Sequence, residues 1–327
     1  MNVSDSERLA STLEKQGYKW TQNKYQADLV AVNTCGVMQT AEKRIYGMIP
    51  DIKKRNKKVK IIVTGCLVYR KDVRRRMDKY VDEWKLITDV AKGGCLDYLK
   101  IIPKYESKIS AFIPIGNGCN NYCSYCVVPY ARGREVWRPA ADIFAEVKNL
   151  VKNEYKEIIL IAQNVNSYKS GKIDFADLLK KINNIPGDFT IKFMTSHPKD
   201  MSDKLIKTMA DCDKFSRQIH LPVQSGDDEI LKKMNRKYTA GAYVNLVKKI
   251  RQAMPDADIS TDIIVGFCGE TKKQFNNTVK LMKQIKFNQA FIARYTPRPG
   301  TAAYKMADNV TKENKKQRWL ILNSLIK

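Results

Sequence analysis

The stretch at residues 111–126 reads Ala-Phe-Ile-Pro-Ile-Gly-Asn-Gly-Cys-Asn-Asn-Tyr-Cys-Ser-Tyr-Cys. Its first five residues are apolar and predict a buried β-strand. Three cysteines, Cys119, Cys123 and Cys126, follow at once, and Gly116 and Gly118 permit close approach of the backbone. In parallel α/β sheets, ligands collect where strands end. The stretch therefore predicts an α/β fold with a ligand site after this strand.

Further strands and helices alternate after the cysteine loop. The candidate strands are 111–115, 157–161, 190–194, 217–223, 258–265 and 289–294. Amphipathic helices lie between them; for example, Tyr243, Leu246, Val247 and Ile250 follow the i, i+3, i+4, i+7 spacing. The pattern predicts a curved, barrel-like parallel sheet of about six βα units, against eight in a full barrel.

The first hundred residues predict a separate, smaller α/β unit. Apolar runs at 27–33 and 59–66 indicate parallel strands with helices on both faces of the sheet. Cys35 and Cys66 fall at the C-terminal ends of these strands, which points to a shared function. The charged stretch 99–108, which contains Pro103, indicates a linker. We therefore expect an N-terminal domain over 1–104 and a core domain over 105–327.

Composition narrows the class of protein. The chain has 327 residues and a formal net charge of +25, with 43% hydrophobic and 28% charged residues. This apolar share supports packed cores and excludes a disordered or fibrous chain. The excess of basic residues favours a polyanionic partner such as a nucleic acid. No apolar run is long enough to span a bilayer, and the polar N-terminus is unlike a secretory signal, so we expect a cytoplasmic protein.

The three clustered cysteines have a spacing that suits an iron–sulfur cluster. The chain has eight cysteines, and without a secretory signal they indicate reduced thiols, metal ligands or catalysis. A structural zinc needs a fourth ligand, and this loop offers none. A [4Fe-4S] cluster held by three cysteines leaves one iron open to a substrate. The alternative of another class is a non-catalytic, zinc-stabilised RNA-binding protein.

The spacing Cys-x3-Cys-x2-Cys, with Tyr125 just before the third cysteine, resembles the radical S-adenosylmethionine enzymes. The resemblance implies that the open iron chelates S-adenosylmethionine and that an electron from the cluster cleaves its sulfonium to a 5′-deoxyadenosyl radical. The cofactors carry this chemistry, while the protein orients them and excludes competing reactions.

Ordered blocks over the whole chain resemble the methylthiotransferases. They are Asn33-Thr34-Cys35, Gly65-Cys66, residues 118–133, Gln163-Asn164-Val165-Asn166, Thr195-Ser196-His197-Pro198, residues 220–226 and Arg298-Pro299-Gly300-Thr301. Among the methylthiotransferases the sequence is most similar to the MiaB family, the tRNA-2-methylthio-N6-dimethylallyladenosine synthases. The implied fold is a Rossmann-like α/β domain followed by a radical SAM partial (β/α)6 barrel.

The family resemblance implies an activity, cofactors and partners. The activity is transfer of a methylthio group to C2 of N6-isopentenyladenosine, 3′ of the anticodon in tRNA. One [4Fe-4S] cluster maps onto Cys119, Cys123 and Cys126, and an auxiliary [4Fe-4S] cluster maps onto Cys35 and Cys66. S-adenosyl-L-methionine and a flavodoxin- or ferredoxin-type electron donor complete the system, and we expect a monomer. The alternatives are the branches that modify threonylcarbamoyladenosine in tRNA or a ribosomal protein.

Several polar and glycine residues at strand ends are candidates for binding S-adenosylmethionine. They are Tyr125, Gln163, Ser196, Gln224, Gly266, Gly269 and Glu270. The last three occupy the family's Gly-x-x-Gly-Glu position, for which an ordinary βα turn is the alternative. For Gln163, Ser196 and Gln224 the alternative is strand-end capping.

Charged residues and the remaining cysteines have less specific interpretations. Arg132, Arg134 and Arg138 are either contacts to substrate phosphate or base, or a solvated charge run. His197 and His220 are expected in packing and hydrogen bonding, because radical hydrogen abstraction needs no general base. Cys95 and Cys212 match no motif and are expected to be structural.

The sequence also departs from the family pattern. The family has a third auxiliary cysteine two residues before the position of Met1, so the auxiliary ligand set here is incomplete. The C-terminal TRAM β-barrel of the family is absent, and we expect a chain truncated at both ends. Cys268 replaces a usual proline and Ala162 a usual glycine, both near the expected cofactor site.

Overall fold

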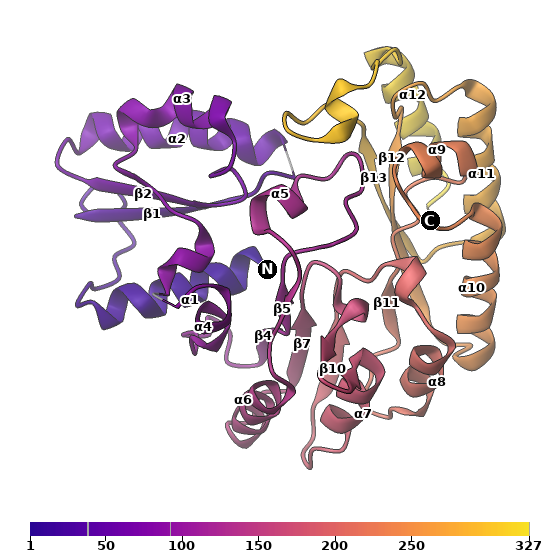
Figure 1. Ribbon diagram of the computed structural model, residues 1–327, viewed down its shortest axis with the longest axis horizontal. Coiled ribbons are helices and arrows are strands. Elements are labelled where there is room, and N and C mark those ends of the chain that lie inside the picture. The colour runs from indigo at the N-terminus through magenta and orange to yellow at the C-terminus, as the bar shows by residue number, and fades with distance from the viewer. Residues whose placement is uncertain (38, 92, 327) are drawn as a thin grey trace.

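The structure is a computed structural model that describes residues 1–37, 39–91 and 93–326. Its N-terminal part contains a parallel sheet of β1 (Leu29–Thr34), β2 (Lys60–Gly65) and β3 (Glu83–Trp84). The helices α2 (Gln39–Arg55) and α3 (Lys71–Met77) cover one face (Figure 1). The helices α1 (Asn2–Lys15) and α4 (Cys95–Lys100) lie on the other.

The register of β1 and β2 sets the positions of two cysteines. The last paired residues of the two strands are Thr34 and Gly65. Cys35 and Cys66 are the next residue of each strand, so they leave the same edge of the sheet side by side. This placement at the two strand ends confirms the expectation from the sequence.

The second part of the chain forms a curved parallel sheet. Its strands are β4 (Ser110–Pro114), β7 (Glu157–Ile161), β10 (Thr190–Phe193), β11 (Gln218–His220), β12 (Asp258–Val265) and β13 (Gln289–Arg294). They lie in chain order, and a parallel bridge between Ile191 and Phe215 joins the first three strands to the last three. This order confirms the predicted partial barrel.

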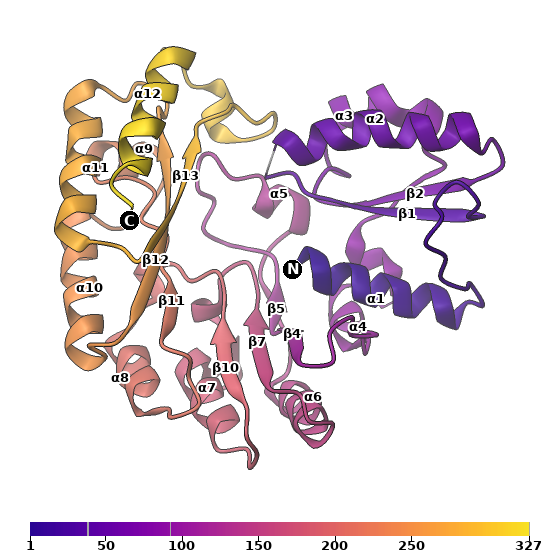
Figure 2. The ribbon, with the colours of Figure 1, turned by 180° about the vertical axis from the view of Figure 1, so that it is seen from behind.

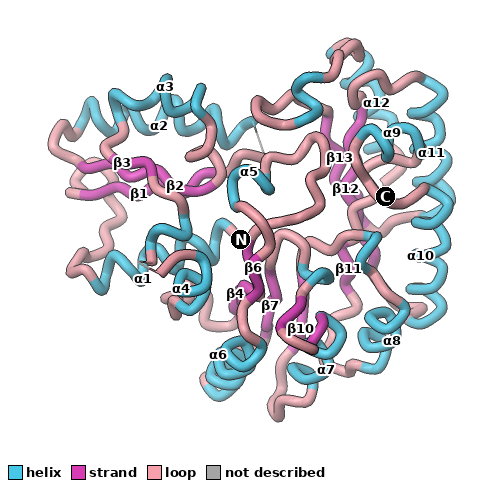
Figure 3. Tube along the Cα trace, viewed as in Figure 1, coloured by secondary structure: helices cyan, strands magenta, loops and turns pink. Residues whose placement is uncertain are grey.

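Helices line the outer face of this sheet (Figures 2 and 3). They are α6 (Ala140–Lys152), α7 (Phe175–Asn183), α8 (Asp203–Asp211), α10 (Ala240–Ala253), α11 (Lys272–Ile285) and α12 (Lys312–Asn323). The short helices α5 (Val128–Arg132) and α9 (Asp228–Lys233) follow strand ends. Two short antiparallel pairs join β5 (Gly116–Asn117) to β6 (Val136–Trp137) and β8 (Lys169–Ser170) to β9 (Ile173–Asp174). The 3₁₀ turns are Asp78–Tyr80, Ile87–Val90, Val165–Ser167, Pro198–Asp200 and Ala302–Lys305.

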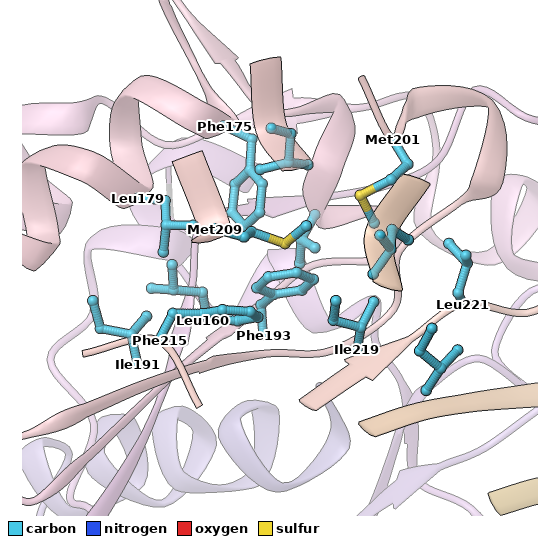
Figure 4. Close-up of a cluster of buried hydrophobic side chains, with 14 of the residues drawn as sticks. Leu160, Phe175, Leu179, Ile191, Phe193, Met201, Met209, Phe215, Ile219 and Leu221 are labelled. Atoms are coloured by element: carbon cyan, nitrogen blue, oxygen red, sulfur yellow. The ribbon is translucent and has the colours of Figure 1, made fainter. Parts of the chain in front are cut away.

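A continuous apolar core lies between the sheet and these helices. Figure 4 shows a part of it, in which Phe193 stacks on Phe215 with ring centroids 5.3 Å apart and meets Phe175 edge-on. Met201 and Met209 fill the space beside them. Because apolar burial is the main favourable term in folding, this core fixes the strand ends that carry the candidate site.

Two sequence predictions differ from the structure. The strand expected at 217–223 spans 218–220, because the Leu221 carbonyl accepts hydrogen bonds from the side-chain hydroxyls of Tyr243 and Thr261 instead of from a backbone amide of β12. The linker expected at 99–108 begins later, since Leu99 belongs to α4 and is fully buried. The boundary at 104 and 105 stays a prediction.

Helix α1 joins the two parts of the chain. The carboxylate of Asp5 in α1 forms an ion pair with Arg132 at the end of α5, and both side chains are buried. The hydroxyl of Tyr98 donates to the same carboxylate. Arg8, also fully buried, lies 3.8 Å from Glu146 of α6. In the described part of the chain, no helix is both long and apolar enough to cross a membrane.

Candidate functional site

The cysteine loop leaves the C-terminal end of β4 under tight steric constraint. Gly118 has φ +88°, and a Cβ atom there would lie 2.1 Å from the carbonyl oxygen of Arg134. A Cβ atom on Gly116 would lie 2.2 Å from the Trp137 ring. Gly116 therefore lets the loop pack against β6, and Gly118 lets it pack against the backbone just before β6, where no larger residue would fit without moving that backbone.

The three cysteines of the loop are close together and largely shielded from water. Cys119 and Cys123 are buried, and Cys126 is partly exposed. Burial raises the pKa of the Cys126 thiol to about 12, and the thiols of Cys123 and Cys119 add to the rise. Burial likewise raises the pKa of Cys119. A bound cationic centre reverses this preference, because it stabilises thiolates.

The auxiliary cysteines lie beside this loop. A Cβ atom on Gly36 would lie 3.1 Å from Cβ of Cys66 and 3.3 Å from Cγ2 of Val127. Val127 directly follows Cys126, and the thiol of Cys66 also contributes to the raised pKa of Cys126. The structure thus brings together two cysteine sets that lie more than fifty residues apart in sequence.

A single structural zinc ion needs four ligands, and the cysteine loop supplies three. All eight cysteines are free thiols. In the described ranges, no three or more histidine, cysteine or acidic side chains are grouped so as to hold one metal ion. Zinc requires its ligands to converge at about 2.3 Å from one point. In a four-iron cluster each cysteine binds a different iron, so the thiols stand farther apart.

A segment that the sequence analysis did not single out supports the cysteine loop. The backbone amide and hydroxyl of Ser124 donate to the carbonyls of Met234 and Lys233, at 3.0 and 2.7 Å. The side-chain amide of Asn235 donates to the Tyr122 carbonyl at 2.9 Å. Residues 233–238, which we call the cradle segment, therefore fix the loop from the side of α9.

Arg236 of the cradle segment contacts a cysteine directly. Its Nη1 lies 3.6 Å from Sγ of Cys123, and the side chain is only 8% exposed. In the sequence this arginine is one of 59 basic residues, next to Lys237 and near Lys232 and Lys233. No local sequence pattern shows that Arg236 is buried while these three lysines are exposed.

Three predicted cofactor residues occupy the same strand-end rim and have protein partners. The Oε1 atom of Gln163 accepts a hydrogen bond from the Gly118 amide at 2.5 Å. The hydroxyl of Ser196 donates to the His220 carbonyl. Gln224 has φ +69°, and its amide donates to the Asp262 carbonyl at 2.9 Å. Gln163 thus braces the cysteine loop; contact of all three with S-adenosylmethionine stays a prediction.

The turn after β12 is organised by Glu270. Its buried carboxylate accepts from the Gly266 amide at 2.7 Å and pairs with Arg318 of α12 at 2.6 Å. Burial raises the pKa of this carboxyl group. A Cβ atom on Gly266 would lie 2.3 Å from Cγ of Lys315, so helix packing accounts for this glycine. The Gly269 amide donates to the Asn309 side chain at 3.0 Å. Binding of S-adenosylmethionine at this turn stays a prediction.

Tyr125, which precedes the third cysteine of the loop, packs against the neighbouring apolar cluster. Its contact with S-adenosylmethionine likewise stays a prediction.

Two of the three arginines that follow the cysteine loop form buried ion pairs. Arg132 pairs with Asp5 and Arg138 with Glu146, and both guanidinium groups are buried. Both alternatives offered by the sequence, substrate contact and a solvated charge run, are therefore wrong for these two, because each cation neutralises a buried carboxylate. Arg134 is exposed.

The histidines and remaining cysteines have structural surroundings. His197 is buried and accepts from the Lys199 amide at 3.2 Å, and His220 contacts Ser260 at 3.0 Å. These contacts match the expected hydrogen-bonding role. Cys212 is buried at the end of α8, and Cys95 lies half-buried at the start of α4, with a pKa raised by burial.

This fold and site define a radical S-adenosylmethionine enzyme. Residues 113–282 match the model of the Radical SAM superfamily, and residues 1–87 match the uncharacterized protein family UPF0004. Among solved structures, the radical S-adenosylmethionine methyltransferase TsrM from Kitasatospora setae aligns with a TM-score of 0.65 at 14% identity. That alignment covers 92% of this chain and 73% of the other. The cobalamin-dependent radical enzyme OxsB aligns at 0.64 and 10% identity, covering 99% and 53%. At this identity, both likenesses show the fold.

Curated relatives identify the family. The tRNA-2-methylthio-N(6)-dimethylallyladenosine synthase of Clostridium novyi (strain NT) is 43% identical over 98% of this chain and 77% of its own length. That of Thermoanaerobacter sp. (strain X514) is 44% identical over 97% and 74%. The chain belongs to the family of tRNA-2-methylthio-N(6)-dimethylallyladenosine synthases, within the radical SAM methylthiotransferases. Its cofactors are accordingly S-adenosylmethionine and [4Fe-4S] clusters.

Proposed function

We propose that this enzyme transfers a methylthio group to C2 of N6-isopentenyladenosine, 3′ of the anticodon in tRNA. The observation that carries the proposal is the approach of the two cysteine sets, in which Gly36 lies against both Cys66 and Val127. A methylthio group must be delivered where the hydrogen of C2 is removed. Two cluster sites that lie next to each other, with Gly36 between them, satisfy this requirement. The 43% identity to the Clostridium novyi synthase supports the same substrate.

In this proposal each group of residues has a distinct role. Cys119, Cys123 and Cys126 hold the cluster that, with S-adenosylmethionine bound, supplies the oxidising radical. Gln163 and the cradle segment keep the cysteine loop in place through the Gly118 and Tyr122 backbone groups. Cys35 and Cys66 belong to the auxiliary cluster.

Exposed groups beside the cysteine loop suit a tRNA substrate. Tyr122 and Tyr130 are 41% and 46% exposed and meet edge-to-face with ring centroids 6.1 Å apart. Arg134 is exposed nearby in sequence. Aromatic rings stack on unpaired bases, and arginines bind phosphates, so these side chains are suited to an anticodon loop. The partners in this proposal are tRNA and a flavodoxin- or ferredoxin-type donor in the cytoplasm.

Anaerobic reconstitution followed by two product measurements tests this function. The parent chain is expected to cleave S-adenosylmethionine and to convert N6-isopentenyladenosine in tRNA to its 2-methylthio derivative, detected by nucleoside mass spectrometry. The variant Cys119→Ala/Cys123→Ala/Cys126→Ala should lose both activities. The variant Cys35→Ala/Cys66→Ala should keep cleavage and lose transfer.

Other outcomes would contradict the proposal in recognisable ways. A 2-methylthio product of threonylcarbamoyladenosine, or a methylthiolated ribosomal protein, would place the enzyme in another branch of the methylthiotransferases. One zinc per chain without iron or acid-labile sulfide would favour an RNA-binding protein. Undiminished cleavage by the triple variant would show that these cysteines do not hold the reacting cluster.

A further inference from the structure

Arg236 is a buried cation of the cradle segment, and it contacts Cys123, one of the three cysteines of the loop. Three of its nitrogen atoms have partners: Nη1 donates to Sγ of Cys123, Nη2 donates to the Pro222 carbonyl at 2.7 Å, and Nε donates to the Tyr238 hydroxyl at 2.8 Å. The side chain is 8% exposed. Its orientation is therefore fixed by the protein and does not depend on solvent.

The surroundings of Arg236 leave its charge without a carboxylate partner in the described part of the chain. The structure pairs Arg132, Arg138 and Arg318 with buried carboxylates. The groups that contact Arg236 are instead a thiol, a carbonyl and a phenol. A buried, uncompensated positive charge costs free energy, and a negatively charged cluster beside it removes that cost.

We propose that Arg236 raises the reduction potential of the cluster held by Cys119, Cys123 and Cys126. It is a positioning residue, and it acts through its hydrogen bond to Sγ of Cys123. This inference rests on the proposed role of Cys119, Cys123 and Cys126. Reduction by one electron from the external donor makes the cluster more negative. A fixed cation and an N–H···S hydrogen bond stabilise that reduced form and raise the potential, more strongly in a shielded site than in water.

The contacts of Arg236 also link the cluster to the cofactor rim. The Pro222 carbonyl that it binds lies two residues before Gln224, and Tyr238 donates to the Val223 carbonyl at 2.9 Å. One guanidinium group thus fixes Cys123 relative to the end of β11. A change at Arg236 should affect both the potential and the alignment of the cysteine loop with that strand.

The test is a potentiometric titration, followed by electron paramagnetic resonance, of chains that also carry Cys35→Ala/Cys66→Ala. In this background only the cluster of Cys119, Cys123 and Cys126 contributes. Arg236→Gln removes the charge and should shift the midpoint to a more negative value. Arg236→Lys keeps the charge but loses the three directed bonds, so its midpoint should lie between those of the parent and Arg236→Gln. Lys232→Gln, the same charge change at an exposed lysine outside the cradle segment, should titrate like the parent.

Iron content separates the possible failures. If the background chain binds no four-iron cluster, the proposed function fails and not this inference alone. If Arg236→Gln binds four irons and titrates like the background chain, the inference is overturned. If Arg236→Gln does not retain iron, Arg236→Lys decides: a shift to a more negative potential supports the role of Arg236, and an unchanged midpoint overturns it.

Discussion

The hydroxyl of Tyr69 donates a hydrogen bond to the carbonyl of Pro299 at 3.3 Å, across 230 residues of sequence. Tyr69 follows Cys66 by three residues, and Pro299 belongs to the segment Arg298-Pro299-Gly300-Thr301. Arg298 donates to the Val37 carbonyl at 2.9 Å, next to the Cys35 loop. These two contacts therefore join the segment 298–301 to both loops that carry Cys35 and Cys66.

These two hydrogen bonds lead to a prediction about coupling between the two cluster sites. In Tyr69→Phe/Arg298→Ala, the auxiliary loops lose two hydrogen bonds to the core, while the Cys119 loop keeps its own partners. We expect cleavage of S-adenosylmethionine to continue and methylthio transfer to fall by about ten-fold, because small errors in alignment are costly to a transfer step. The ratio of 5′-deoxyadenosine to methylthiolated nucleoside measures the effect.

A tyrosine in the same region provides the control for that experiment. Tyr304 is 52% exposed in the 3₁₀ turn after Thr301. Tyr304→Phe should leave the product ratio unchanged. A parallel loss of cleavage and transfer in the double variant would indicate general damage to the fold rather than loss of alignment.

The constraint on Gly118 predicts a specific loss of iron. Gly118→Ala places a Cβ atom 2.1 Å from the Arg134 carbonyl oxygen, a backbone atom that no side-chain rotation can move away. The cysteine loop must then move, so we expect iron bound at this site to fall below half of the parent value in a Cys35→Ala/Cys66→Ala background. Iron and acid-labile sulfide analysis after reconstitution measures it.

Gly133 separates this steric effect from backbone strain. It also has a positive φ, +75°, but nothing lies within 4 Å of a Cβ atom there. Gly133→Ala should lower the unfolding free energy by about 1–3 kcal/mol, because φ +75° with ψ −165° is a backbone conformation that glycine alone adopts readily, and iron content should stay normal. Equal iron loss in both variants would point to strain as the common cause.

The buried pair of Asp5 and Arg132 predicts a large effect on stability. Both side chains are almost inaccessible to water. Asp5→Asn leaves a guanidinium group buried without its counter-charge, and we expect the unfolding free energy to fall by about 3–5 kcal/mol. Arg134→Ala, at an exposed arginine two residues away, should change it by less than about 0.5 kcal/mol. Denaturant titration of both variants compares them, and a loss below 1 kcal/mol in Asp5→Asn would contradict the argument.

The sequence is most informative where a function depends on neighbours in the chain. The gathering of Cys119, Cys123 and Cys126 in one loop was predictable because the three lie within eight residues of sequence. Cys35 and Cys66 were predictable because the ends of parallel strands meet at one edge. The fold followed from alternating apolar runs for the same reason, since each strand and helix carries its own periodicity.

Contacts between distant segments were not predictable in this way. Arg132 and Arg236 are buried by partners that lie more than a hundred residues away, at Asp5 and Cys123. In sequence they cannot be distinguished from the many exposed basic residues. The end of β11 at His220 likewise depends on the Tyr243 and Thr261 hydroxyls, which belong to α10 and β12.

His197 predicts a dependence of stability on pH. Burial, together with the nearby charges of Arg236 and Lys199, lowers the pKa of His197 from 6.5 to about 2. Between these values the unfolded chain binds a proton that the folded chain does not, so stability decreases as the pH falls below 6.5. The contribution of this one group is about 1.4 kcal/mol per pH unit.

The variant His197→Asn tests this dependence. It keeps an acceptor for the Lys199 amide and removes the titration, so the unfolding free energy should vary less steeply with pH. Above about pH 8, where His197 is neutral in both the folded and the unfolded chain, the parent and the variant should show the same slope. An identical slope at acid pH in the His197→Asn variant would show that other groups dominate the acid response.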